Sequence, residues 1–150
     1  MRILFILFFS CGAGLFGQTD AAVEKAVLAA NQRATQAAEA RDLDGLLRFM
    51  VDTNKGSIVQ DGVLSLSPAD ARARLEPGFR APVKVAYHWK RQHVTVLSPT
   101  LALLVSEGET SVASPNGNFT VPFVQSAIWV LRDGEWKILH AHHSAPAAAR

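Results

Sequence analysis

The stretch IWVLRDGEWKILHAHHSAP, residues 128–146, carries the strongest structural signal in the chain. Two runs rich in aromatic and aliphatic residues flank Asp133 and Gly134. An Asp-Gly pair between such runs favours the left-handed backbone of a tight hairpin turn. The stretch therefore predicts a β-hairpin whose second strand runs from Trp136 to His143.

Two more strands are expected upstream, over residues 83–97 and 101–112, and the first strand of the hairpin extends back to Phe119. Residues 83–97 contain Val, Tyr, Trp and Thr, which favour strands, and Pro, Asn and Gly residues separate the segments. Pro122 predicts an edge position or a bulge, because proline has no amide hydrogen to donate. Together with the hairpin, these segments predict a meander of four antiparallel strands.

The first half of the chain predicts helices. Apolar residues recur at spacings of three and four over residues 20–40 and again over residues 42–50. Ser67, followed by proline and an acidic residue, predicts the start of a third helix, which we expect to end by residues 76–78.

Residues 57–60 and 63–66 predict two short strands that are joined by a second Asp-Gly turn. The expected order is two helices, two short strands, a helix and the meander, which is an α+β fold. A curved sheet has to bury one face, and the N-terminal helices are available to cover it. A sheet wrapped around helices forms a cone with one open end, where pockets form.

The final hairpin resembles the C-terminal hairpin of the nuclear transport factor 2-like superfamily. The shared features are an aromatic strand, an Asp-Gly turn, a tryptophan and a His-x-His-x-Ser ending, here Trp129, Asp133, Gly134, Trp136, His140, His142 and Ser144. ARDLDGLLRFM, residues 40–50, resembles the second helix of that superfamily, and VTVLSPTLALLVSEGE, residues 94–109, resembles its central hairpin. The likeness is greatest to SnoaL-like domains and to the association domain of calcium/calmodulin-dependent protein kinase II.

The resemblance covers residues 21–146. It implies a cone-shaped, curved antiparallel sheet wrapped around N-terminal helices, also called a cystatin-like roll. We therefore expect one SnoaL-like domain at residues 20–146 and a loose tail at residues 147–150. The superfamily includes isomerases, dehydratases, epoxide hydrolases, binding proteins and assembly modules, so the resemblance implies a fold and leaves the activity open.

Residues 1–17 have the pattern of a secretory signal peptide, with a basic Arg2, an apolar run and small residues after it. We expect the protein to be exported, either to a periplasm or out of the cell. Cys11 offers an alternative as the lipidated first residue of a lipoprotein. No later run approaches the length of a membrane span, so we expect no transmembrane segment in the mature chain.

The charge pattern does not favour a nucleic-acid partner. The chain has 15 Lys and Arg against 13 Asp and Glu, a net charge of +2, and it has no run of basic residues.

The resemblance also suggests pocket residues. Ala127 and His143 stand where the kinase association domain has pocket arginines, so we do not expect its strongly cationic pocket here. We expect His143 to point into the cone and to act as an acid or base, because histidine exchanges protons near neutral pH. The second catalytic candidate is Tyr87, as a donor to an oxyanion. The predicted ligand-binding residues are His143, Tyr87, Trp89, Gln125 and Ala127.

His140 and His142 share the opposite face of the last strand. Two histidines are fewer than the three protein ligands of a catalytic zinc site, and the third would have to come across the sheet from His88, His93, Glu107 or Glu109. We expect both to hydrogen-bond within the sheet, and we predict no metal and no cofactor. Glu107 and Glu109 share a face of another strand and are expected to be solvated.

Two functional hypotheses follow. The first is an exported SnoaL-like protein that binds a small, largely apolar metabolite and acts as a lyase, isomerase or hydrolase through His143. The alternative is a non-enzymatic dimerisation or ligand-binding module with the same fold. In both cases we expect a homodimer formed through the outer face of the sheet, because the last strands carry apolar residues on both faces.

Overall fold

The computed structural model describes residues 19–52 and 55–146. The expected signal peptide at residues 1–17 and the expected tail at residues 147–150 lie outside the described residues. Within them, no helix is both long enough and apolar enough to cross a membrane.

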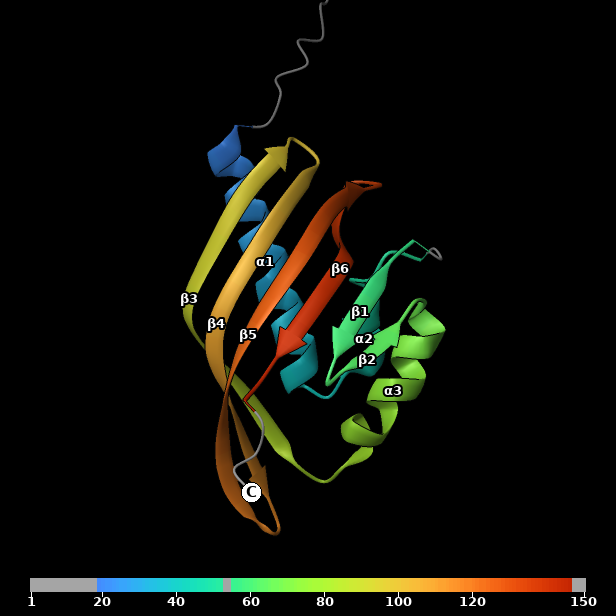
Figure 1. Ribbon diagram of the computed structural model, residues 1–150, viewed down its shortest axis with the longest axis vertical. Coiled ribbons are helices and arrows are strands. Elements are labelled where there is room, and N and C mark those ends of the chain that lie inside the picture. The colour runs from blue at the N-terminus through green and yellow to red at the C-terminus, as the bar shows by residue number, and fades with distance from the viewer. Residues whose placement is uncertain (1–18, 53–54, 147–150) are drawn as a thin grey trace, which may run out of the picture.

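One sheet and three helices form the fold (Figure 1). In chain order the elements are α1 (Asp20–Glu39), α2 (Leu43–Leu47), β1 (Ser57–Gln60), β2 (Val63–Ser65), α3 (Pro68–Arg80), β3 (Lys84–Ser98), β4 (Leu101–Ser114), β5 (Gly117–Arg132) and β6 (Glu135–Ser144). The strands are arranged in the order β2-β1-β6-β5-β4-β3. This confirms the α+β fold, and the parallel pairing of β1 with β6 is an addition to the expected antiparallel sheet.

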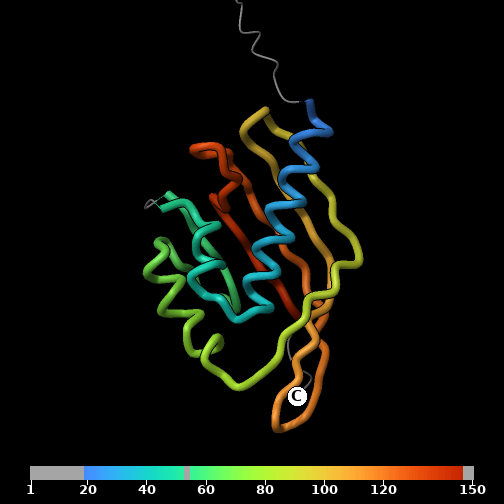
Figure 2. Tube along the Cα trace, turned by 180° about the vertical axis from the view of Figure 1, so that it is seen from behind, coloured from blue at the N-terminus to red at the C-terminus, as the bar shows by residue number. Residues whose placement is uncertain are grey.

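Helix α1 crosses the concave face of the sheet (Figure 2). The Thr19 hydroxyl accepts a hydrogen bond from the Ala22 amide and so caps the helix. One side of α1 consists mainly of small or β-branched residues, which let the helix approach the strands closely. The fully buried centre of the core includes Val23, Val27, Leu104 and Trp129.

Both Asp-Gly turns have the predicted backbone. Asp133 and Gly134 have φ angles of 52° and 79°, and Asp61 and Gly62 have φ angles of 53° and 75°. Two successive left-handed residues match the right-handed twist of the strands that they join.

Helix α3 is longer than predicted. It continues through Pro77 to Arg80 instead of ending by residues 76–78. Proline leaves one backbone hydrogen bond unmade, but an ion pair of 2.7 Å between Glu76 and Arg80 spans this last turn. The extra turn brings Phe79 over the interior of the cone.

Two bulges alter which side chains face the helices. Between Trp89 and Arg91 the register of β3 against β4 shifts by one residue, so Lys90 has no partner. Between Ile138 and His140 the register of β6 against β5 shifts in the same way, and Leu139 is the extra residue. Side chains alternate between the two faces of a strand, so each extra residue exchanges the faces beyond it.

Gly108 pairs with Trp89 beside the first bulge. A Cβ atom there would lie 2.6 Å from the backbone oxygen of His88. The close approach of β3 to β4 thus requires glycine.

Pro122 lies at a local edge and not at a bulge. The β4–β5 register is continuous past Pro122, and β6 first pairs with β5 at Val124. The amide hydrogen that proline lacks is therefore not needed by a neighbouring strand.

Candidate functional site

A cavity of about 510 Å³ lies between the helices and the concave face of the sheet. The helical side is largely apolar and includes Ala34, Ala38, Leu46, Leu47, Met50 and Leu75. The sheet contributes aromatic and polar side chains. A ligand in this cavity would meet an apolar wall on one side and hydrogen-bonding groups on the other.

Four of the five predicted ligand-binding residues line the cavity, namely His143, Tyr87, Trp89 and Gln125. Gln125 and His143 are direct partners across β5 and β6. Their position agrees with the prediction, while their roles in binding and catalysis remain predictions.

Ala127 is the exception and requires a correction. It shares the concave face of β5 with Gln125, but it is fully buried in the core with Val23, Val27 and Trp129. Helix α1 covers this part of the sheet, so the cavity does not reach Ala127.

His143 faces the cavity because of the bulge at Leu139. Ile138 and Ala141 also face the cavity, although their spacing of three residues would place them on opposite faces of a regular strand. The imidazole ring is nearly parallel to the ring of Phe123, at an angle of 8° and a centroid distance of 6.5 Å.

Burial lowers the pKa of His143; the Asp61 carboxylate acts against this shift, and His142 adds to it. The imidazole is therefore neutral at pH 7, and a neutral imidazole can accept a proton from a bound molecule.

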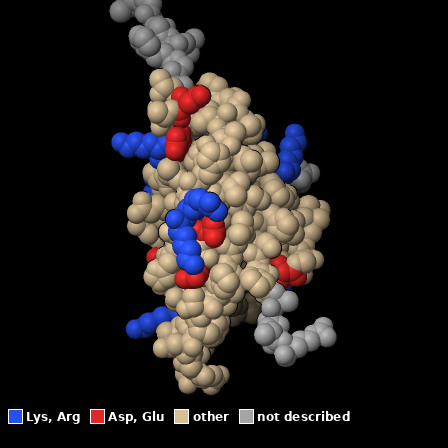
Figure 3. Space-filling model, turned by 60° about the vertical axis from the view of Figure 1, so that its left-hand side comes forward, with Lys and Arg blue, Asp and Glu red and all other residues tan. Residues whose placement is uncertain are grey.

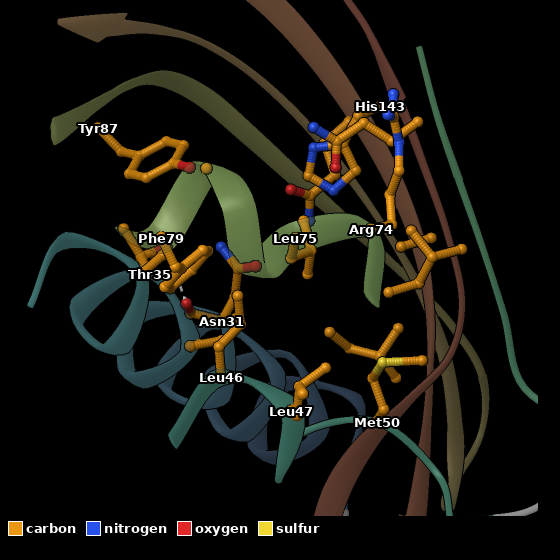
Figure 4. A pocket seen from close by; sticks show the side chains of 18 of the residues that line it. Asn31, Thr35, Leu46, Leu47, Met50, Arg74, Leu75, Phe79, Tyr87 and His143 are labelled. Carbon is orange, nitrogen blue, oxygen red and sulfur yellow. Dashed lines mark hydrogen bonds between the residues drawn. The ribbon is translucent and has the colours of Figure 1, made fainter. Parts of the chain in front are cut away.

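Tyr87 points into the same space from β3 (Figure 4). Its backbone amide donates a hydrogen bond of 2.7 Å to Glu39 Oε1, which ties the strand to the end of α1. Burial raises the pKa of the Tyr87 hydroxyl, the charge of Arg41 opposes the shift, and Glu39 adds to it. The phenol is therefore protonated at pH 7 and can donate a hydrogen bond.

Three aromatic side chains on the concave face of the sheet are in contact with one another. Tyr87 stacks on Trp89 with ring centroids 6.1 Å apart, and Phe123 meets both edge-on, at 5.8 and 5.2 Å. These contacts restrict the movement of the Tyr87 ring. Phe123 was not among the predicted residues, although its spacing from Gln125 places both on one face.

Two polar residues of the cavity were missed by the sequence analysis. Asn31 interrupts the apolar stripe of α1, which is the signal that could have identified it.

Arg41 follows α1 with a left-handed φ of 62°, a conformation more often adopted by glycine at a helix end. Its guanidinium donates to the carbonyls of Gly78 and Ala81 and lies 5.1 Å from the centre of the Phe79 ring. Through these contacts Arg41 holds the C-terminal end of α3 beside the cavity.

Asp61 and Arg74 form an ion pair of 3.7 Å among the more exposed lining residues. Because both side chains remain largely solvated, the pair marks the rim of the cavity and contributes little stability.

His140 and His142 lie on the other face of β6, as expected. His140 Nδ1 is 2.8 Å from the hydroxyl of Ser57, whereas His142 is exposed. Over residues 19–52 and 55–146, no three His, Cys, Asp or Glu side chains are grouped so that they could hold a metal ion. Glu107 and Glu109 pair with Arg91 and Lys90 across the strands.

A family model described as a SnoaL-like domain matches residues 27–148. No curated protein matches the sequence. Among solved structures, a candidate dehydratase of the NTF2-like family from Streptomyces avermitilis is similar, with 16% identity and a TM-score of 0.77 over 87% of this chain and 100% of that one.

Two further solved structures are similar. One is a nuclear transport factor 2-like superfamily protein from Salmonella enterica, with 13% identity and a TM-score of 0.75 over 88% of this chain and 96% of that one. The other is the association domain of calcium/calmodulin-dependent protein kinase II from C. elegans, with 18% identity and a TM-score of 0.69 over 83% and 96%. At these identities the likeness shows the fold alone.

The first prediction concerns His143 and the pH dependence of stability. Its pKa is lower in the folded chain than the ordinary value of 6.5, so the unfolded chain binds the proton more readily. The stability contributed by neutral His143 is complete above about pH 6.5 and is lost as the pH falls below it. We expect the melting temperature of H143Q to fall less between pH 7.5 and pH 5 than that of the wild type.

H88Q is the matched control, because it removes an exposed histidine that does not act on His143. Its melting temperature should fall as much as that of the wild type. Equal losses in H143Q and H88Q would show that His143 is not held neutral by burial.

Proposed function

The chain belongs to the SnoaL-like domain family, and from this premise we propose that it binds a small, largely apolar metabolite in the cavity and transforms it by proton transfer. The observation that carries the proposal is that a neutral imidazole, His143, and a protonated phenol, Tyr87, line the same cavity. In the proposed reaction, His143 accepts or returns a proton, and Tyr87 donates a hydrogen bond to an oxygen atom that gains negative charge.

Such a pair suits a lyase, an isomerase or a hydrolase. The similarity to the candidate dehydratase from Streptomyces avermitilis supports the lyase reading. The largely apolar wall formed by the helices supports an apolar substrate, because charged groups would lose hydration there without compensation.

Export is part of the proposal. Its support is the pattern of residues 1–17, with Cys11 as the alternative lipidation site. N-terminal sequencing of the protein recovered outside the cytoplasm tests it. A mature chain that begins before Cys11 would contradict both forms of processing.

A second candidate function is a dimerisation module without catalysis. Its support is the outer face of the sheet, where Leu103 pairs with Ile128 and where Val105 and Val124 are 38% and 47% exposed. Figure 3 shows charged atoms in a few scattered groups on the side where β3 and α1 lie, with uncharged surface between them. The similarity to a kinase association domain supports an oligomeric state. Homodimerisation through this face is compatible with catalysis in the cavity.

The second prediction tests catalysis. Apolar metabolites that raise the melting temperature are incubated with the protein, and proton NMR follows their conversion. We expect at least one to be converted and H143Q to lower kcat/KM roughly 10²- to 10⁴-fold, because the acid–base group is lost. H142Q should keep the wild-type rate. Ligands that bind but stay unchanged, or an unimpaired H143Q, would remove the catalytic part of the proposal and leave a binding module.

The third prediction tests the outer face. Sedimentation of the chain that begins at Gln18 should give twice the monomer mass at micromolar concentration. V124E should shift the mass to that of the monomer, because a charge on an apolar interface loses its hydration. V63E places the same charge on an exposed position of β2 and should stay dimeric. A monomer mass for the unmutated chain would contradict the dimer.

A further inference from the structure

Asn31 is a buried polar residue whose side chain has an unused donor. The residue is 3% exposed, and its Nδ2 atom has no hydrogen-bond partner in the part of the chain that the structure describes. Figure 4 shows the amide pointing from α1 into the space that Tyr87 and His143 face from the sheet. The side chain therefore points toward the position of a bound ligand.

A structural role does not account for this amide. The neighbouring buried positions of α1 are Ala30 and Ala34, which pack against the sheet without polar groups. Thr35 Oγ1 donates a hydrogen bond of 2.9 Å to the backbone oxygen of Asn31, so the helix backbone is satisfied without the side chain. A buried N–H group without a partner costs stability, and such a cost is commonly kept where a ligand uses the group.

We propose that Asn31 Nδ2 donates a hydrogen bond to an oxygen atom of the ligand and thereby selects molecules with an acceptor oxygen at this position. This inference rests on the proposed function, because it requires an apolar ligand in the cavity. Two other cavity-lining residues also have a buried donor without a partner among the described residues, Trp89 at Nε1 and Arg41 at Nε. The donors of Asn31 and Trp89 are uncharged.

A neutral carbonyl oxygen fits the uncharged donors of Asn31 and Trp89, because a carboxylate in such an apolar place would need a nearby cation. Arg74 is paired with Asp61, whereas Arg41 donates only to the neutral carbonyls of Gly78 and Ala81, and its buried Nε has no partner among the described residues. The proposed ligand class is an apolar ketone, aldehyde or ester, and a carboxylate held by Arg41 is the competing class that the test separates.

The binding test uses three probes of nearly equal shape. These are 2-acetylnaphthalene, 2-isopropenylnaphthalene, in which a CH₂ group replaces the oxygen, and the anion 2-naphthoate. Dissociation constants are measured by equilibrium dialysis at pH 7.5. We expect the wild type to bind the ketone roughly tenfold more tightly than the alkene, since one net hydrogen bond gives a difference of this order. The carboxylate should bind more weakly than the ketone.

The variant N31L removes the donor and keeps the approximate volume. It should bind ketone and alkene equally, with the affinity for the alkene unchanged or increased. Q32A, at an exposed position of the same helix, should keep the tenfold preference. The inference would be overturned if the wild type bound ketone and alkene equally, if N31L kept the preference for the ketone, or if the carboxylate bound more tightly than the ketone. The proposed function would stand in each case.

A second measurement decides the role of Asn31 without any ligand. If its amide awaits a ligand, N31L should melt at the same temperature as the wild type or a few degrees higher, because a buried donor without a partner has been removed. A lower melting temperature would show that the amide has a structural partner and would overturn the inference. If no probe binds at all, the proposed apolar ligand fails, and this comparison still decides the inference.

Discussion

The alternation of side chains along a β-strand is the constraint on which the cavity depends. Without interruption it would place Trp136, Ile138, His140 and His142 on one face, and His143 on the other. The extra residue Leu139 breaks the alternation, so that Ile138 and His143 both face the helices. In β3 the extra residue Lys90 has the same effect. It allows Tyr87 and Trp89 to face inward on a strand whose other half faces inward with Gln92, Val94 and Val96.

The cavity combines features that lower stability with features that make it useful. His143 is kept neutral, Tyr87 is kept protonated, and the Asn31 amide is left without a partner. The unpartnered amide costs free energy in the empty protein, because a buried polar group loses hydration without compensation. The apolar contact of α1 with the sheet offsets this cost. The site is therefore preorganised for a ligand that supplies the missing acceptor.

Much of the fold could be predicted from the sequence, and the reasons are local. Asp-Gly pairs determine the backbone of two turns, and capping residues determine the starts of α1 and α3. The two bulges have no comparable sequence signal, because Lys90 and Leu139 are residue types that also occur in regular strands. Whether such a residue is unpaired depends on the register with the neighbouring strand. Tertiary packing also decides which part of the concave face α1 covers. The sequence therefore did not show that Ala127 is buried under the helix. The position of His143 was expected from a family resemblance.

The proposed chemistry depends on the burial of His143, which keeps the imidazole neutral and able to accept a proton. The most direct test is a pH titration of the ring nitrogens by ¹⁵N NMR, with the signals of His143 assigned by their absence in H143Q. We expect a pKa below the ordinary 6.5 for His143, together with a further change when an apolar ligand fills the cavity. A pKa of 6.5 or above that does not respond to any ligand would contradict it.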